Sequence, residues 1–523
     1  MTRWARLLAV LLILPLVQAV AVTAALAAAG PASPPPAFHQ DRAARIWGSA
    51  LTFMAPRLLK PVPISQLAIW GLSGLTAIDP NLTVQALQGK IVLYGPDRVI
   101  YAIPAPANGP ALGPLWGAAC AAVAAQAYRA SPRLRRAGTG AIIRGFFDEL
   151  FNHFDPYSRY QQPRGNYPAQ TTAGLGLILA RAGTGPSGAV IATKLAASGP
   201  AAQAGMQSGM AVMAINGTKI TNQRLQALQT MLTGPVGSTV SLTVRPPHSL
   251  PQTINLTRAL VLPATVFHRM RDGIGVIQVK AFGPNTGQEF AAALAGLAGQ
   301  TPPPTGIVID LRGNRGGVLR QSVLSVDTLL SHGVIVRTIG RAQAANRIFR
   351  AEGGDLARGL PVVILVDGQT ASAAEVFSAA LSDNDRAVVV GSATLGKGLV
   401  QSVAHLPDGG TLYVTWSRIF APRGWPLQGL GVMPQVCTSL GTRAVRAQMQ
   451  ALRAGHDLLA RDLAAARSAR RPLALAQILE IRDACPATIG ANDDFRAAES
   501  LIGHPRRYHA ALIRPMQAGV KTG

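Results

Sequence analysis

The chain of 523 residues carries 49 lysines and arginines against 24 acidic residues, a formal net charge of +25, and 48% of it is hydrophobic. That length and apolar content suffice for three or more domains. The arginines are scattered singly, without the dense runs or interleaved aromatics of a nucleic-acid groove, so we expect no nucleic-acid partner and interpret the charge as favouring anionic membrane surfaces. Three cysteines are too few for a disulfide scaffold or a thiolate metal site, and no cofactor is indicated.

The N-terminal residues 1–29 are typical of an export signal. Arg3 and Arg6 precede a long apolar run, and Ala25-Leu26-Ala27 is a small-residue cleavage pattern. The apolar run is also nearly long enough to span a bilayer, so an uncleaved membrane anchor is the alternative. Both interpretations predict an exported protein of the periplasm or cell envelope.

Residues 40–160 are predicted to be mostly helical, interrupted by a hairpin over 90–103 with its turn at Gly95-Pro96-Asp97. From Ala173 to about Leu262 the pattern changes to short strands and turns. A helix is expected within 221–232.

This second region resembles a PDZ domain over about ninety residues. The stretch Gly174-Leu175-Gly176-Leu177 matches the loop whose backbone N–H groups capture a peptide's C-terminal carboxylate, while the following strand pairs with the peptide. The turns at 205–209 and 215–217 match the PDZ pattern as well. A glycine-rich β domain of another kind is the alternative.

Residues 270–436 alternate strands and helices, which predicts an α/β layer structure. The apolar strand PVVILVD ends at Asp367, and the strong helix former ASAAEVFSAAL begins at Ala371. Ser372 is therefore expected at a strand-to-helix turn, near free N–H groups that favour developing negative charge. A plain N-capping serine is the alternative.

Lys397 lies in a segment rich in glycine and aliphatic residues, and no Asp or Glu occurs from Arg386 to Pro407. Burial disfavours an ammonium and can lower a lysine pKa by several units, so a neutral amine could take the proton from Ser372. A surface lysine whose stem covers apolar residues is the alternative. Spacing alone does not decide between them.

Five motifs, in the same order, resemble those of the carboxyl-terminal processing peptidases, also called tail-specific proteases. The resemblance covers about residues 140–436, with 25 positions between Ser372 and Lys397 as the family has. The motifs are FDPYSRY (154–160), IDLRGNRGG (309–317), TASAAE (370–375), LGKGLVQ (395–401) and WSRIFAPRGWPLQGLGVMP (416–434).

The resemblance implies Ser372 as nucleophile, Lys397 as general base and Gln401 as the residue that orients the lysine. It implies backbone N–H groups of Gly317 and Ala373 as an oxyanion hole, a role that needs no side chain. It also implies a crotonase/ClpP-like α/β core with the PDZ-like domain inserted before it.

Four positions depart from the family pattern. Gln369 stands where Gly is usual, Asp367 where Asn is common, Arg315 where Pro is common and Gln435 where Asp is usual. None removes a proposed catalytic group. Because of its bulk, Gln369 is expected to narrow the oxyanion region or alter specificity.

Together these features predict an exported serine endopeptidase that recognises free C-termini of proteins or peptides and cleaves near them. A catalytically inactive PDZ scaffold that binds protein tails is the alternative, and a basic surface-binding protein is a weaker one. In an oxidising compartment Cys437 and Cys485 could pair around a helical segment. The predicted parts are the signal or anchor (1–29), a Pro-rich spacer (30–39), a mostly helical region (40–167), the PDZ-like domain (168–262), the protease core (263–436) and a helical C-terminal region (437–523).

Overall fold

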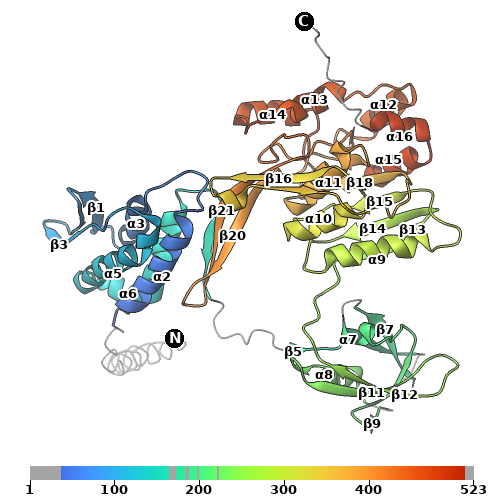
Figure 1. The fold of residues 1–523 in the computed structure, drawn as a ribbon, viewed down its shortest axis with the longest axis horizontal. Helices are drawn as coiled ribbons and strands as arrows, with labels where there is room; N and C mark the ends of the chain where they lie inside the picture. Colours follow the sequence, from blue (N-terminus) through green and yellow to red (C-terminus); the bar gives the residue numbers. More distant parts are fainter. Residues whose placement is uncertain (1–36, 164–171, 183–187, 197–198, 221–222, 513–523) are drawn as a thin grey trace, which may run out of the picture. The chain divides into compact units, whose positions relative to one another are not determined.

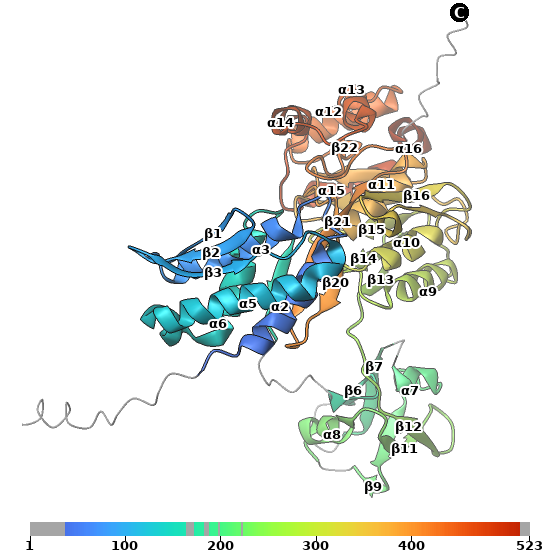
Figure 2. The same cartoon turned by 60° about the vertical axis from the view of Figure 1, so that its left-hand side comes forward.

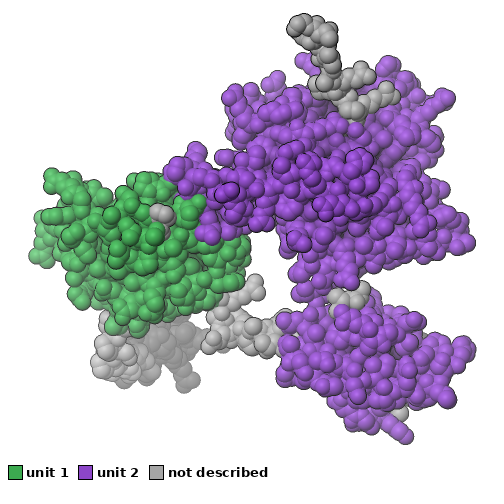
Figure 3. Space-filling view, viewed as in Figure 1, with its two compact units in different colours: residues 1–56, 62–163, 403–413 green, residues 57–61, 164–402, 414–523 purple. Residues whose placement is uncertain are grey.

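The computed structural model describes residues 37–163, 172–182, 188–196, 199–220 and 223–512. The predicted signal or anchor lies outside these residues. No helix within the described ranges is long and apolar enough to cross a membrane. The chain forms two compact units, coloured separately in Figure 3: residues 1–56, 62–163 and 403–413, and residues 57–61, 164–402 and 414–523.

The first unit is mainly helical, as the sequence predicts. Its core contains Trp47 stacked on Phe146, with ring centroids 4.6 Å apart. The predicted hairpin is confirmed, and it extends to a sheet of order β1-β2-β3 because a further strand, missed from the sequence, pairs with β2. The elements are α2 (Gln40–Met54), α3 (Ile64–Leu72), α4 (Gly74–Ile78), β1 (Thr83–Leu87), β2 (Lys90–Tyr94), β3 (Val99–Pro104), η1 (Pro110–Leu112), α5 (Gly113–Ala130), α6 (Pro132–Phe151) and β4 (Arg159–Gln161).

The PDZ-like region is a small β domain with its own apolar core. Its main sheet has the order β12-β11-β8-β7-β6, so β6 lies at one edge, and α8 packs beside β6. Leu177, Leu179 and Leu228 are buried in the core between this strand and this helix. The elements are β5 (Thr172–Ala173), β6 (Leu177–Arg181), β7 (Val190–Leu195), α7 (Pro200–Gln203), β8 (Ala211–Ile215), β9 (Thr218–Lys219), α8 (Leu225–Met231), β10 (Gly234–Pro235), β11 (Thr239–Arg245) and β12 (Gln252–Thr257).

The core region is built on a sheet of order β13-β14-β15-β18-β19-β22, in which β13 pairs antiparallel with β14 and all other neighbouring strands pair in parallel. All five residues of β18 are buried, as expected for a parallel strand covered on both faces. The predicted α/β layer is confirmed. The strands are β13 (Val266–Arg271), β14 (Ile274–Val279), β15 (Ile307–Asp310), β18 (Val362–Val366), β19 (Val388–Gly391) and β22 (Val436–Cys437).

Helices cover both faces of this sheet, as Figure 1 shows. Phe290 and Phe377 lie in the core under α9 (Thr286–Ala298), α10 (Leu319–Asp327) and α11 (Ala373–Asp383). On the other face, the core contains side chains from three C-terminal helices: α12 (Thr442–Arg453), α15 (Asn492–Ile502) and α16 (Pro505–Ala511).

A second sheet, of order β17-β16-β21-β20, is visible beside the first in Figure 2. Residues 411–413 of its long strand β21 belong to the first unit and pair there with β4. This sheet matters for the site because β20 carries Gln401. The elements are β16 (Val334–Gly340), η2 (Gln343–Ala345), β17 (Arg347–Arg350), β20 (Leu399–His405) and β21 (Thr411–Phe420).

The C-terminal region is helical, with α13 (Ala460–Ser468) and α14 (Leu475–Asp483) between α12 and α15. The last forty residues, which show no clear pattern in the sequence, contribute α15 and α16. A disulfide joins Cys437 at the end of β22 to Cys485 after α14. The chain between the two cysteines is therefore tied to the core sheet at both ends.

Candidate active site

Two loops leave the same edge of the core sheet and meet. One follows β15 and the other follows β18, and parallel neighbours place their carboxyl ends side by side. The backbone N–H of Ala371 donates to the carbonyl of Asn314 (2.9 Å), which cross-links the loops. Asp367 adds a second link, because its Oδ1 accepts the N–H of Gly313 at 3.0 Å. Asn is common at this position in the resembled family, and the Asp present here still organises the turn.

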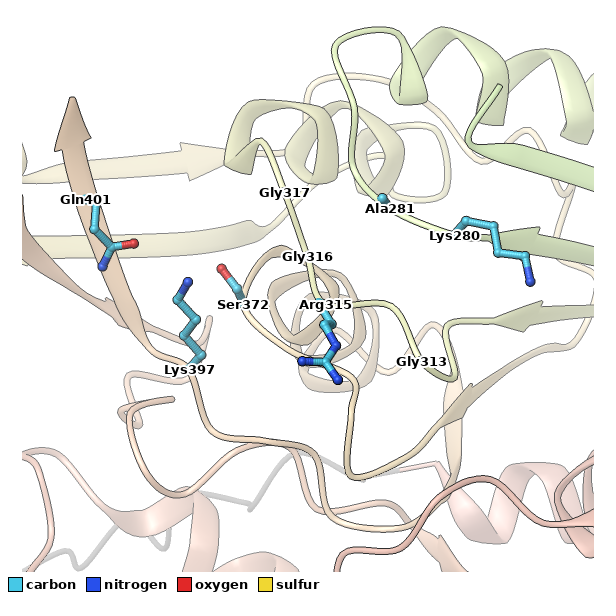
Figure 4. Close-up of a pocket in the computed structure, with 9 residues that line it drawn as sticks. All are labelled: Lys280, Ala281, Gly313, Arg315, Gly316, Gly317, Ser372, Lys397 and Gln401. Atoms are coloured by element: carbon cyan, nitrogen blue, oxygen red, sulfur yellow. The ribbon is translucent and has the colours of Figure 1, made fainter. Parts of the chain in front are cut away.

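Ser372 lies at the turn predicted from the sequence, immediately before α11. Its backbone has φ +57° and ψ −118°, a combination that costs a non-glycine residue on the order of 1–3 kcal/mol. Such strain persists only where the surroundings hold the residue in place. Figure 4 shows the hydroxyl pointing into a cavity of about 460 Å³.

In the loop after β15, the backbone N–H groups of Gly316 and Gly317 differ in whether they are hydrogen-bonded. The N–H of Gly316 donates to Oδ1 of Asn314 at 2.8 Å. Among the residues the structure describes, no acceptor is bonded to the N–H of Gly317 or to that of Ala373, the first residue of α11. Two backbone donors beside Ser372 are therefore available for an oxygen that develops negative charge.

Neither Gly316 nor Gly317 has room for a side chain, because neighbouring atoms lie too close to its Cα. A Cβ at Gly316 would lie 2.8 Å from the Cβ of Ser372, and one at Gly317 would lie 2.2 Å from the carbonyl oxygen of Phe282. Both also have positive φ, +91° and +145°. A side chain at either position would push the loop away from the nucleophile.

Lys397 comes from the loop between β19 and β20 and lines the same cavity. Its amine lies beside the Ser372 hydroxyl, and the Gln401 carboxamide lies on the far side of the amine (Figure 4). The Gln401 amide nitrogen donates to Oγ1 of Thr415 at 3.1 Å, on the neighbouring strand. This bond fixes the carboxamide and leaves its oxygen able to accept an N–H.

The surroundings of Lys397 differ from the sequence expectation. The residue is half-buried. Its backbone also contacts a carboxylate, because the Lys397 N–H donates to Oε2 of Glu375 at 2.9 Å. The acid-free segment from Arg386 to Pro407 gave no sign of this contact, since Glu375 belongs to a different helix.

Glu375 is the residue that sequence reasoning missed as part of the site. It is fully buried, and its Oε2 accepts the backbone N–H of Ser372 (2.6 Å) as well as that of Lys397. Its Oε1 accepts the Thr394 hydroxyl (2.5 Å) and the Gly396 N–H (2.6 Å). Burial raises the pKa of the Glu375 carboxyl, and these four donors act to lower it. The signal in the sequence was the Ser-x-x-Glu spacing of a capping box.

The cavity wall is cationic. Lys280 and Arg315 line it together with Lys397, and none of the lining residues that the structure describes is acidic. Gln369 is not among the residues that line the cavity, and its expected effect on the oxyanion region stays a prediction. Gln435 is buried away from the cavity, where it accepts the Val389 N–H and donates to Ser382.

Comparisons with known proteins find two matching families and several relatives. Residues 273–438 match the model of peptidase family S41, and residues 167–245 match that of the PDZ domain. A carboxy-terminal-processing protease of Bartonella bacilliformis is 34% identical over 45% of this chain and 55% of its own length. A carboxyl-terminal-processing protease of Synechocystis is 33% identical over 54% of this chain and 67% of its own length. Among solved structures, a photosystem II D1 C-terminal processing protease aligns at 29% identity over 61% of this chain and 88% of that chain, with a TM-score of 0.34.

We predict that Glu375→Gln lowers kcat for peptide cleavage by about 10², with a much smaller change in KM. The amide group cannot accept all four donors, so the Ser372 and Lys397 loops lose their common anchor, and small misplacements of reacting groups cost rates of this order. Steady-state kinetics beside a thermal melt measure both effects. The matched control is Glu480→Gln, an exposed glutamate on α14. A Glu375→Gln enzyme with wild-type kcat would show that the anchor is dispensable.

Proposed function

The chain belongs to the carboxyl-terminal processing proteases of peptidase family S41, and we propose that it is a serine endopeptidase that cuts proteins near their C-termini with a Ser372–Lys397 dyad. The observation that carries this proposal is the convergence of the Ser372 hydroxyl and the Lys397 amine on one cavity that Gly317 also lines, with the unbonded N–H of Ala373 directly after Ser372 in the chain. The groups come from three loops that are distant from one another in the sequence, so their meeting is a result of the fold. The alignments span 55% and 67% of the lengths of the two relatives.

The proposed reaction uses only protein groups. The Ser372 oxygen attacks the carbonyl carbon of the scissile amide while the neutral Lys397 amine accepts the hydroxyl proton. The N–H groups of Gly317 and Ala373 stabilise the resulting alkoxide. When the tetrahedral intermediate collapses, the Lys397 ammonium returns the proton to the departing amine. A water molecule, deprotonated by the same lysine, then releases the acyl group from Ser372.

Gln401 is proposed to orient the lysine rather than to take part in proton transfer. Its bond to Thr415 holds the carboxamide on β20, and its oxygen can accept one N–H of Lys397. An amide is suited to this role because it directs the amine without adding a charge that would favour the ammonium.

The PDZ-like domain is proposed to select substrates by their free C-termini. Among the described residues, the N–H groups of Leu175 and Gly176 have no bonded acceptor, and both lie in the predicted carboxylate-binding loop. The carbonyls of the same two residues are used within the domain, by the N–H groups of Ala201 (3.0 Å) and Ala196 (2.7 Å). The loop is thus held by its carbonyls and offers its donors, as binding of an anion requires.

We further propose that the protein is exported to the periplasm or cell envelope. The basic and apolar N-terminus supports export, and so does the Cys437–Cys485 disulfide, since such bonds persist in oxidising compartments. An inactive scaffold is the less favoured alternative, because the Ser372 turn and the available donors would have no use in it.

For the dyad, Ser372→Ala and Lys397→Ala should each abolish cleavage of an unstructured substrate without changing the circular dichroism spectrum. Because the two residues act as one unit, the double variant should be no slower than either single variant. Ser468→Ala and Lys90→Ala, both at exposed positions, are the matched controls. Substantial activity in Lys397→Ala would refute this mechanism while leaving Ser372 as nucleophile open to test.

For tail selection, one peptide is compared as a free acid, as a C-terminal amide and with a terminal Asp. Binding to Ser372→Ala protein should weaken about tenfold or more for the amide, the scale of a charge-assisted hydrogen bond. A terminal Asp should also bind less well than an aliphatic residue, because β-strand addition places that side chain against an apolar wall that includes Leu177. Equal binding of all three peptides would mean that residues 173–262 do not select tails.

For export, the mature protein should begin near Ala28 and appear in the extracytoplasmic fraction. Intact-mass measurement of protein expressed with its own N-terminus tests this directly. A full-length product in the membrane fraction would establish the anchor instead. Full-length protein in the cytoplasm would contradict export altogether.

A further inference from the structure

The strand that should receive a peptide tail is already engaged by a side chain. β6 is the edge strand of the PDZ-like sheet, and a tail that binds by strand addition must pair with its open edge. The side chain of Gln229, on the adjacent helix α8, reaches this edge. Its Nε2 donates to the carbonyl of Leu177 at 3.0 Å, and its Oε1 accepts the N–H of Leu179 at 3.4 Å.

The two bonded groups are those that an incoming strand would use. Leu177 and Leu179 flank Ile178, whose carbonyl accepts the Thr193 hydroxyl on the neighbouring strand β7. Successive residues of a strand direct their backbone groups to opposite sides, so the Leu177 carbonyl and the Leu179 N–H face away from β7. A carboxamide has a carbonyl oxygen that accepts a hydrogen bond and an NH2 group that donates one, so it can bond an N–H and a C=O at the same time. Gln229 therefore occupies two backbone groups that a bound tail would otherwise use.

We propose that Gln229 competes with the C-terminal tail for the edge of β6 and so lowers the affinity of every peptide that binds there by strand addition. An incoming peptide must displace the carboxamide, so its first two backbone hydrogen bonds replace existing ones and add little net affinity. Net binding free energy must then come from tail groups that have no counterpart in Gln229. These features are the free carboxylate, held by the N–H groups of Leu175 and Gly176, and the terminal side chain.

The consequence is a lower affinity for tails and internal segments alike, so that only a segment with a free carboxylate keeps enough affinity to stay bound. An internal segment of an unfolded protein has the same backbone groups as a tail but no terminal carboxylate, so it gains little by displacing Gln229. This inference rests on the proposed function of the domain, because it assumes that tails bind by strand addition. The ligand class is an extended peptide with a free carboxylate and an unsubstituted backbone N–H facing Leu177.

The test uses the full chain with Ser372→Ala, so that bound peptides are not cut. A fluorescent free-acid peptide and its amide are titrated against this protein and against versions that also carry Gln229→Ala or Gln229→Leu. We expect about three- to tenfold tighter binding of both peptides in both variants, since each removes the competing hydrogen bonds. The relative preference for the free acid should be retained, because the carboxylate loop is untouched.

Gln226→Ala is the matched control. It removes the same atoms from the same helix, but Gln226 is exposed and, among the described residues, its side chain forms no hydrogen bond with β6. It should leave both affinities unchanged. Unchanged or weaker tail binding in Gln229→Ala would overturn the inference. Tighter binding in Gln226→Ala to the same extent would also overturn it, by attributing the effect to the helix as a whole.

Hydrogen–deuterium exchange separates failure of this inference from failure of the proposed function. In the ligand-free protein, the segment containing Leu179 should exchange faster in Gln229→Ala than in the parent, because that N–H loses its acceptor. If exchange is unchanged, the contact does not protect the edge and the inference fails, whatever the tails do. If exchange rises but no tail binds more tightly, then tails do not use β6, and the proposed tail selection fails with it.

Discussion

The geometry of the site depends on one buried carboxylate. Ser372 follows β18 and Lys397 follows β19, so the proposed nucleophile and the proposed base lie on separate loops. Glu375 accepts the backbone N–H of both residues through a single oxygen, at 2.6 and 2.9 Å. A carboxylate is costly to bury unless its acceptors are filled, and here Thr394 and Gly396 fill the other oxygen. The loops cannot separate without leaving this group unsatisfied, which also explains how the strained backbone of Ser372 is maintained.

The C-terminal region supports the same loops from the other side. The Gly368 N–H donates to the Thr488 carbonyl at 2.7 Å, and Arg312 pairs with the buried Asp494 at 3.1 Å. Thr488 lies three residues after Cys485, whose disulfide to Cys437 fixes this stretch to the end of β22. Segments more than a hundred positions later in the chain therefore brace the turn before Ser372 and the loop that carries the glycines. The region called helical from the sequence is a structural part of the site.

Local signals in the sequence predicted the parts of the structure that depend on near neighbours. The strand, turn and helix around Ser372 and the hairpin after Lys90 follow from apolar runs and turn residues, and both are found. The α/β layer and the family were also predicted, and both are confirmed. The roles of Ser372, Lys397 and Gln401 remain predictions.

What failed depends on contacts between distant segments. Glu375 reaches Lys397 across 22 positions, so the absence of acids near Lys397 in the chain misrepresented its surroundings. β1 was missed because a short exposed strand has little apolar pattern, and four of its five residues are exposed. The Gln229 contact is set by how α8 packs against β6, which no single-segment pattern encodes.

Side-chain amides decide which backbone donors are available in both proposed binding regions. In the core, Asn314 occupies the N–H of Gly316, while the N–H of its neighbour Gly317 has no acceptor among the described residues. In the PDZ-like domain, Gln229 occupies the N–H of Leu179, while those of Leu175 and Gly176 are likewise unbonded within the described part of the chain. An amide oxygen satisfies a donor without bringing a charge, so it removes that donor from competition without repelling a nearby anion. In the proposed function, an alkoxide at one site and a carboxylate at the other would be directed to the donors that remain. We infer that the position at which each site binds an anion depends on which N–H groups are already hydrogen-bonded. The fold sets that pattern of bonding, and the presence of glycines alone does not determine it.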